Sequence, residues 1–335
     1  MTKFQSLLES DQLFLYREVE DLKNISVLML EKDYWVCILL DHLFNYSAFK
    51  DCFVFKGGTS LSKAYHAIER FSEDIDLILD WRKIDYSSDI PWKERSNTQQ
   101  DKFNREMNAV AAEFYEKKLV PTLNKEFLER FNRDNLFEVD PKDPMIVRFN
   151  YPIIKLDSED SYILDYIKLE IGPLAEWTPS HRVSISPYLA EEKPEFFEKK
   201  STEVLTVDIE RTFWEKITIL HKIANFPETK SVPERYSRHL YDVYCMGNSD
   251  VKKKAFANKD LLARDVMFKQ KFYYAKGAHY ETATLETVKL VPTESCIKEL
   301  SVVYKKMGNM IYGAKPDFDT IIEYLKELEI EIHNL

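Results

Sequence analysis

The stretch FVFKGGTSLSKAYHAIERFSEDIDLIL, residues 53–79, decides the expected fold of this chain. It opens with a short apolar run that ends at a glycine pair, Gly57 and Gly58. A helix-patterned segment follows over residues 62–70, and strand character returns from Ser72 onward. This order predicts a strand, a glycine turn, a helix and a second strand.

The glycine turn is a candidate phosphate site. Gly57 and Gly58 allow backbone N–H groups to approach a phosphate, and the positive end of the following helix points the same way. The hydroxyl of Thr59 or Ser60 can donate a hydrogen bond to a phosphate oxygen, although a helix N-cap would explain either hydroxyl equally well. Lys56 is either a phosphate contact or a solvated lysine at the end of the strand.

Asp74 and Asp76 are candidate metal ligands. They are two residues apart on the second predicted strand, so both carboxylates project to one face. Carboxylates can hold Mg²⁺, and paired metal ions stabilise both the attacking oxygen and the leaving pyrophosphate of an in-line displacement. A bare Asp-x-Asp is usually only a polar strand end. The glycine turn before it favours a site for Mg²⁺, or alternatively Mn²⁺, that holds a triphosphate.

A third carboxylate, Glu170, is a candidate to activate an acceptor hydroxyl. It lies near the end of an alternating segment over residues 162–171 and shares a face with Lys168. This segment and the alternating residues 145–151 predict an antiparallel hairpin with a turn at 157–161. The alternative for Glu170 is an ion pair with a lysine on a neighbouring strand.

Composition narrows the class of protein. A chain of 335 residues favours two domains, and a net charge of −10 argues against general coating of nucleic acid, which needs a positive surface. The four cysteines show no metal-ligand spacing. No signal peptide and no apolar run of about 18 residues are present, so a cytoplasmic protein without membrane contact is expected.

The predicted domain boundary is near residue 205, where strand periodicity gives way to helix periodicity. Residues 1–205 are expected to form a sheet domain with N-terminal helices, including an amphipathic helix that begins at Glu31. Residues 206–335 are expected to be helical, beginning with a helix that Asp208 caps. The predicted fold class is therefore α+β, a mixed sheet with helices followed by a helical lobe.

Two blocks carry a resemblance to a known family. KGGTSLSK at residues 56–63 and RFSEDIDL at residues 70–77 match the patterns KGGTxLxK and RxSxDIDL at every defined position. The later segments EKI at 215–217 and RHLYDV at 238–243 are similar to a third and a fourth motif, with His239 in place of an acid. The chain thus resembles the nucleotidyltransferase superfamily and, more narrowly, the AbiEii/AbiGii abortive-infection toxin family, which includes the MenT-type tRNA nucleotidyltransferase toxins.

The resemblance implies a polymerase-β-like nucleotidyltransferase fold and transfer of a nucleoside monophosphate from an NTP, with Mg²⁺. It implies that Asp74 and Asp76 bind the metal. It also places Ser60, Ser72 and the motif lysine Lys63 among the nucleotide-binding residues.

Lys216 and Asp242 complete the active site from the helical lobe if the resemblance holds, which would put the site in a cleft between the two lobes. Such a lysine could contact the triphosphate, and such an aspartate could act as a base. Each residue also has an ordinary explanation. Lys216 borders an apolar stripe and could reach solvent, and Asp242 follows Arg238 by four residues, the spacing of a helical ion pair.

The expected partners also follow from the resemblance. They are a cognate antitoxin, often a DNA-binding repressor, and a tRNA 3′ end as acceptor, with phage defence as the role. Residues 252–276 hold eight basic residues and two acids among aromatic residues, which suits a stacked RNA end or an amphipathic helix with a buried aromatic face. Two other functions remain open: nucleotidylation of a protein or small molecule, and NTP sensing without chemistry.

Overall fold

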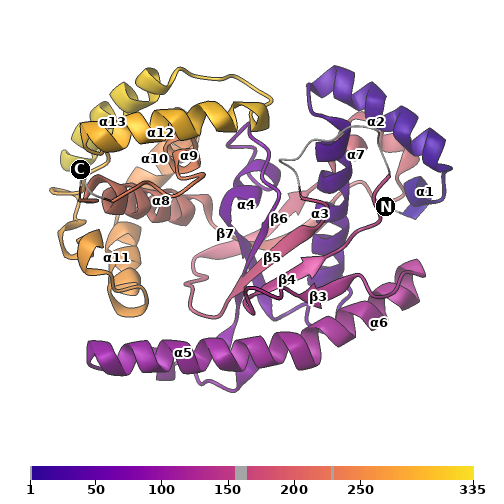
Figure 1. Ribbon diagram of the computed structural model, residues 1–335, viewed down its shortest axis with the longest axis horizontal. Coiled ribbons are helices and arrows are strands. Elements are labelled where there is room, and N and C mark those ends of the chain that lie inside the picture. Colours follow the sequence, from indigo (N-terminus) through magenta and orange to yellow (C-terminus); the bar gives the residue numbers. More distant parts are fainter. Residues whose placement is uncertain (1, 155–163, 228–229) are drawn as a thin grey trace. The chain divides into compact units, whose positions relative to one another are not determined.

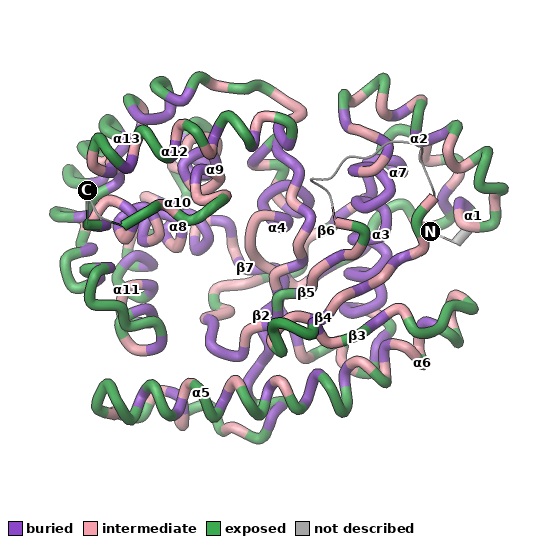
Figure 2. Tube along the Cα trace, in the orientation of Figure 1, coloured by how far each residue is buried: buried purple, intermediate pink, exposed green. Residues whose placement is uncertain are grey.

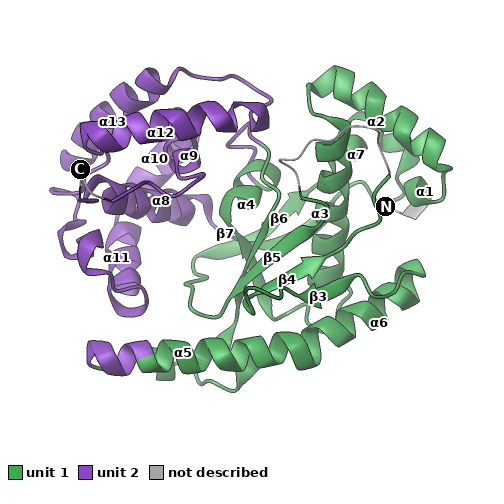
Figure 3. Ribbon diagram, viewed as in Figure 1, with its two compact units in different colours: residues 1–64, 71–95, 102–206 green, residues 65–70, 96–101, 207–335 purple. Residues whose placement is uncertain are grey.

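The computed structural model describes residues 2–154, 164–227 and 230–335. The chain divides into two compact units, which Figure 3 distinguishes by colour. The first unit comprises residues 1–64, 71–95 and 102–206, and the second comprises residues 65–70, 96–101 and 207–335.

One mixed sheet organises the first unit. Within the described residues it has seven strands in the order β3-β4-β5-β2-β1-β7-β6. β1 pairs antiparallel with β2 and parallel with β7, and β2 pairs parallel with β5. This mixture of strand directions, together with the helices, confirms the predicted α+β class. The strands are β1 (Phe53–Lys56), β2 (Ile75–Leu79), β3 (Phe137–Val139), β4 (Ile146–Phe149), β5 (Ile167–Gly172), β6 (Ser180–Ile185) and β7 (Thr202–Val207).

The predicted antiparallel hairpin is confirmed in its strands. β4 pairs antiparallel with β5, with Val147 opposite Leu169. The predicted turn at 157–161 lies outside the described residues. The short strands β3 and β6 were not predicted, because neither shows a run of alternating apolar residues.

Helix α3 (Val27–Asn45) is the most buried helix of the first unit. It begins at Val27 rather than at the predicted Glu31, because the Ser26 hydroxyl caps it by accepting a hydrogen bond from the Met29 amide at 3.4 Å. The helix is not amphipathic, as Figure 2 shows by its almost continuous buried colour. Since α2 (Glu9–Lys23) and α7 (Tyr188–Glu192) also pack on it, charged residues in its first half are enclosed.

The helix between the two motif strands differs from the prediction of residues 62–70. Helix α4 runs over Gly57–Lys63, so the glycine turn itself opens the helix. The next residues leave the helix because residues 65–70 belong to the second unit, where Arg70 forms an antiparallel bridge with Ile311. The following strand accordingly begins at Ile75 rather than Ser72.

A long helical segment, predicted over residues 99–131, lies mostly in the first unit, while its first residues, up to 101, are grouped with the second. It consists of α5 (Asn97–Phe114), a π-helical turn (Tyr115–Leu119) and α6 (Val120–Phe131), and it runs as one nearly continuous stretch in Figure 1. The short N-terminal helix α1 (Thr2–Gln5) precedes α2.

The second unit is helical. Asp208 occupies the predicted N-cap position of its first helix, although its side chain makes no capping hydrogen bond. Trp214 and Phe213 of that helix are fully buried. No described helix in either unit is long and apolar enough to cross a membrane. The principal helices are α8 (Ile209–Ala224), α9 (Ser237–Gly247), α10 (Asp250–Ala257), α11 (Asp260–Phe272), α12 (Glu294–Met307) and α13 (Phe318–His333).

Candidate active site

Three charged residues lie abreast on neighbouring strands of the first unit. In the antiparallel pairing of β1 with β2, Lys56 is opposite Asp76. In the parallel pairing of β2 with β5, Glu170 is aligned with the same aspartate. Side chains at paired positions share a face of the sheet, so the structure brings together Lys56, Asp76 and Glu170.

The glycine turn is packed directly against Asp76. Gly57 has a φ of +80°, a backbone conformation that residues other than glycine rarely adopt. A Cβ atom at this position would lie 1.9 Å from Asp76 Oδ2. Glycine is therefore required at residue 57 both for the turn and for the close approach of the carboxylate.

The hydroxyls of Thr59 and Ser60 are buried and serve the turn. The Thr59 hydroxyl lies within hydrogen-bonding distance of the Ser72 carbonyl, 3.2 Å away, and of the Asp74 carbonyl. The Ser60 hydroxyl donates to the Gly57 carbonyl at 2.8 Å. The turn is thus tied to the segment that carries the two aspartates. Phosphate contact by either hydroxyl, or by Ser72, stays a prediction.

Asp74 carries an oxygen that nothing in the described part of the chain satisfies. Its Oδ1 atom is buried without a hydrogen-bond partner among those residues. Burial raises the pKa of this carboxyl, and the negative charges of Glu73 and Asp76 add to the effect, while Lys168 and Lys32 oppose it. A cation at Oδ1 would relieve both the missing contact and the charge repulsion.

The donor set fits a divalent metal bound together with a triphosphate. Within the described ranges, no group of three or more His, Cys, Asp or Glu side chains is arranged to hold a metal by itself. Mg²⁺, however, is commonly held by one or two carboxylates, with phosphate oxygens and water supplying the other ligands. The oxygen atoms of Asp74 and Asp76 are suited to that role.

Lys63, predicted to bind nucleotide, forms a buried ion pair. Its Nζ atom lies 2.8 Å from Asp33 Oδ1, and both side chains are 3% exposed. The ammonium also lies 3.4 Å from the centre of the Tyr188 ring, within cation–π distance. The structure thus places Lys63 between α3 and α7, where it holds helix α4 to its surroundings.

The sequence interpretation missed Lys32 and Glu73. Lys32 Nζ lies 2.8 Å from Glu73 Oε2 and donates to the Leu164 carbonyl at 2.9 Å. Both side chains are buried. Through Lys32, helix α3 contacts both Glu73, the residue before Asp74, and Leu164 in the segment that precedes β5. The available signal was the charge run Glu31-Lys32-Asp33 within an otherwise apolar segment.

The second unit holds a separate buried cluster around Asp242. Arg70 binds this carboxylate through two nitrogens, Nε at 2.7 Å and Nη2 at 2.9 Å. Lys216 Nζ donates to Asp242 Oδ2 at 2.8 Å and lies 3.1 Å from His239 Nδ1. The structure therefore brings Lys216 and Asp242 together, as predicted for a shared role, and adds Arg70. The ion pairs of Asp242 join it to residues distant in sequence, Arg70 and Lys216, and not to Arg238 at the i,i+4 spacing.

Charge balance in this cluster favours an ionised Asp242. Burial acts to raise its pKa, but the charges of Arg70 and Lys216 outweigh burial and hold the pKa below its usual range. A carboxylate that two cations bind is a poor proton acceptor near neutral pH. Burial, with Lys216 and Arg238, lowers the pKa of His239 well below its usual value, so this imidazole is neutral. These contacts favour a positioning role for Asp242.

The basic and aromatic segment predicted to contact RNA divides into buried and exposed residues. Phe268 and Phe272 of α11 are each 3% exposed and belong to the core. Tyr273 and Tyr274, which follow the helix, are 51% and 55% exposed. Lys269 is buried, with its ammonium 3.4 Å from Asp265. Only the two tyrosines among these aromatic residues present rings at the surface.

Comparison with known proteins identifies the family. A model of the family described as nucleotidyl transferase AbiEii toxin, type IV toxin–antitoxin system, matches residues 38–324. The chain belongs to this family. Among solved structures, it is similar to MenT4, the nucleotidyltransferase toxin Rv2826c from Mycobacterium tuberculosis H37Rv, with 15% sequence identity over 98% of both chains and a TM-score of 0.46. No curated protein matches the sequence.

Family membership confirms the resemblance drawn from the two glycine and aspartate blocks. Both blocks lie inside the matched range, as do Glu170, Lys216 and Asp242. This AbiEii-family chain is a nucleotidyltransferase toxin of a type IV toxin–antitoxin system. The roles of its individual site residues stay predictions.

Proposed function

We propose that this AbiEii-family chain transfers a nucleoside monophosphate from an NTP to the 3′ end of a tRNA in a Mg²⁺-dependent reaction. The acceptor oxygen would form a bond to the α-phosphorus, and the bond from that phosphorus to the leaving pyrophosphate would break. The observation that carries the proposal is the pair Asp74 and Asp76. One has an unsatisfied buried oxygen, and the other is packed against a glycine turn.

The residues of the first unit take distinct roles in this proposal. Asp74 and Asp76 would hold Mg²⁺, which neutralises charge on the triphosphate when it is bound. Gly57 and Gly58 are the first two residues of helix α4. Their backbone N–H groups would donate hydrogen bonds to a phosphate oxygen. Glu170, aligned with Asp76 and exposed, would accept the proton of an acceptor hydroxyl.

The cluster of the second unit supports a contact with phosphate. Arg70, Lys216 and Asp242 carry two positive charges and one negative charge, so the cluster is net positive beside a neutral His239. A net positive group attracts a triphosphate. Lys216 is the proposed contact, and Asp242 holds its ammonium in place.

An RNA acceptor is supported by Tyr273 and Tyr274. Exposed aromatic rings next to lysines, here Lys271 and Lys276, are suited to stacking on unpaired bases. A tRNA 3′ end supplies such unpaired bases. The family further supports a cognate antitoxin; a DNA-binding repressor as that antitoxin and a role in phage defence are part of the proposal.

The experiment incubates the purified protein with each labelled NTP, Mg²⁺ and total tRNA. We expect label on RNA from the wild type and a loss of more than about a hundredfold in Asp74→Asn and Asp76→Asn, since each removes a charge from the metal site. Asp85→Asn is the matched control, because Asp85 is exposed and its φ of 69° suits asparagine.

The outcomes separate the proposal from its rivals. Label on a protein or small molecule with none on RNA would select another acceptor. No transfer to any acceptor, together with toxicity that persists in folded Asp74→Asn/Asp76→Asn, would show that the chain acts by binding NTP. Transfer to RNA that continues after complete removal of divalent metal by chelation would overturn the metal assignment.

A further inference from the structure

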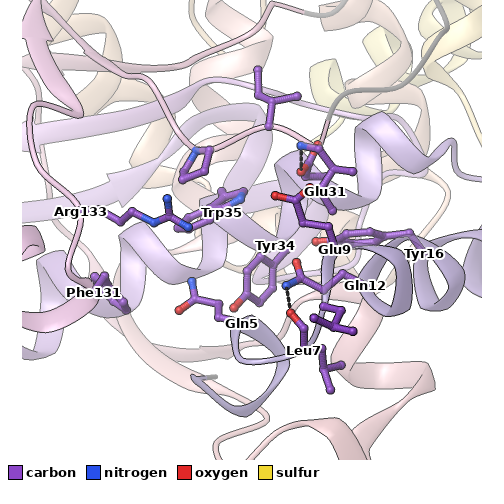
Figure 4. A pocket seen from close by; sticks show the side chains of 14 residues that line it. Gln5, Leu7, Glu9, Gln12, Tyr16, Glu31, Tyr34, Trp35, Phe131 and Arg133 are labelled. Atoms are coloured by element: carbon purple, nitrogen blue, oxygen red, sulfur yellow. Dashed lines mark hydrogen bonds between the residues drawn. The ribbon is translucent and has the colours of Figure 1, made fainter.

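A cavity of about 400 Å³ lies in the first unit, among residues that the nucleotidyltransferase site does not use. This volume falls within the range of roughly 300–1,000 Å³ that is typical of small-molecule sites. Neither the glycine turn nor Asp74 or Asp76 lines it. The lining comes from the two N-terminal helices and their link, from α3, from residues 131 and 133, and from residues 152–154 (Figure 4).

Glu31 is the chemically unusual residue of this cavity. Its side chain lies on buried helix α3 and the residue is 2% exposed. Its Oε1 atom accepts a hydrogen bond from the Ile154 amide at 2.8 Å. Among the residues that the structure describes, no lysine, arginine or histidine pairs with this carboxyl. Burial raises the pKa of Glu31 to about 7, with a smaller contribution from Glu9.

The surroundings of Glu31 combine a second acid, a hydroxyl and aromatic rings. Figure 4 shows Glu9 and Tyr16 beside Glu31, with Trp35 between this group and Arg133. Tyr16 is 1% exposed, and burial, with the negative charge of Glu31, raises the pKa of its hydroxyl. The described lining includes two carboxylates, those of Glu9 and Glu31, and one guanidinium, that of Arg133, so with all three ionised it carries one net negative charge.

A buried carboxylate without a cation is costly, because it loses hydration without gaining an ion pair. A cationic ligand would restore that pairing, and the faces of aromatic rings also favour a positive charge. An anion or a neutral molecule would leave the carboxylate uncompensated. The cavity is therefore expected to prefer a positively charged ligand.

We propose that this cavity binds a small organic cation, an amine or amidinium attached to an apolar or aromatic body. The positive group would pair with Glu31 and reach the Tyr16 hydroxyl. The body of the ligand would lie against Trp35 and Tyr34. This site is separate from nucleotidyl transfer and does not depend on the function proposed above.

The test compares benzamidine with its neutral isostere benzamide on the full chain, by titration calorimetry at pH 8, where Glu31 is ionised. We expect saturable binding of benzamidine to the wild type, and binding of benzamide at least about tenfold weaker, since a charged hydrogen bond is replaced by a neutral one. This comparison needs no variant. Absence of saturable benzamidine binding, or equal binding of the two compounds, would overturn the proposal.

Variants then locate the site. Glu31→Gln should bind benzamidine at least about tenfold more weakly while remaining folded by circular dichroism. Asp74→Asn, outside the cavity, should bind it as the wild type does. Asp21→Asn, an exposed carboxylate on α2, is the matched control for loss of charge. Unchanged affinity in Glu31→Gln, or lost affinity in Asp74→Asn, would assign benzamidine to another site.

Discussion

At the residue scale, three positions stand out in the first unit. One is a very close approach between backbone and carboxylate. The other two are carboxyl groups: among the described residues, a buried oxygen of one lacks a hydrogen-bond partner, and the other lacks a paired cation. Gly57 has no side chain because Asp76 occupies the space that a Cβ would need. Asp74 has an oxygen for which the described chain offers no partner. Glu31, in a different part of the first unit, is a buried acid that no cation among the described residues pairs with. Each of these features is unfavourable for the stability of the fold, and such features are expected at functional sites.

Gly57→Ala tests the close approach of the turn to Asp76. The added Cβ would meet Asp76 Oδ2, and the left-handed backbone would be strained, so we expect a loss of about 1–3 kcal/mol in the free energy of unfolding. Nucleotidyl transfer should fall by more than tenfold through displacement of Asp76, about 1.4 kcal/mol or more. Urea unfolding and the labelling assay measure the two effects.

Gly172→Ala is the control for Gly57→Ala, because a Cβ at Gly172 meets nothing within 4 Å. It should unfold and react nearly as the wild type does. Equal activity of Gly57→Ala and wild type would show that the position of Asp76 against the turn is unimportant.

Glu31 should make stability depend on pH. Its pKa is about 7 in the folded chain against 4.5 when unfolded, so the folded state holds the proton more tightly. The resulting stabilisation is complete below pH 4.5 and is lost as pH rises through 7, a total of about 3 kcal/mol. Urea unfolding of the wild type and Glu31→Gln between pH 4.5 and 8 should show the variant gaining relative stability with pH. Parallel curves would contradict the assignment.

At the element scale, helix α3 is the central support of the first unit. Three consecutive charged residues, Glu31, Lys32 and Asp33, are all buried on it. Lys32 reaches Glu73 beside the aspartate strand, and Asp33 reaches Lys63 at the end of helix α4. Helix α3 is therefore linked both to the end of helix α4 and to the segment just before strand β2. The predicted amphipathic helix would have left its charged face in water, whereas these three charged residues are buried.

Lys32→Met tests this support. The substitution leaves the Glu73 carboxylate buried without its cation, so we expect a loss of about 3–5 kcal/mol in the free energy of unfolding. Adding Glu73→Gln should restore part of that loss, because the uncompensated charge is removed. Lys117→Met is the control, since the ion pair of Lys117 with Glu113 is exposed. Urea unfolding distinguishes them, and equal stability of Lys32→Met and wild type would refute the role.

At the scale of the whole molecule, the predicted site residues are distributed over both compact units. Asp74, Asp76 and Glu170 belong to the first unit, and Lys216 and Asp242 belong to the second. The chain carries a net charge of −10, so attraction to nucleic acid cannot come from overall charge. Under the proposed function, binding of an RNA acceptor would depend on local groups such as Tyr273 and Tyr274, two exposed aromatic residues that follow α11.

Tyr273→Ala/Tyr274→Ala tests this dependence. Loss of two stacking rings should raise the tRNA concentration for half-maximal labelling by about tenfold or more, at roughly 1–3 kcal/mol per stacked base. The exposed ring of Phe14, on α2 of the first unit, supplies the control variant Phe14→Ala. Equal RNA dependence in both variants would remove the tyrosines from the acceptor site.

Much of the fold and of the site was predictable because the relevant signals are local. Alternation predicted the pairing of β4 with β5, and helical periodicity predicted α5, α6 and α8. The motif helix was misplaced, since residues 65–70 have a helical pattern but form no helix and belong to the second unit, where Arg70 bridges Ile311. Periodicity reports which face is apolar and carries no information about which neighbour covers it.

The sequence by itself determined the family and the glycine and aspartate motif, because these depend on residues a few positions apart. Only the tertiary structure decided which charges are buried and what each one meets. Lys32 finds Glu73 at a separation of 41 residues, and Arg70 finds Asp242 at a separation of 172. Such pairs exist only when folding excludes water and brings distant side chains into contact, and the same burial encloses Glu31 where the described residues offer it no cation.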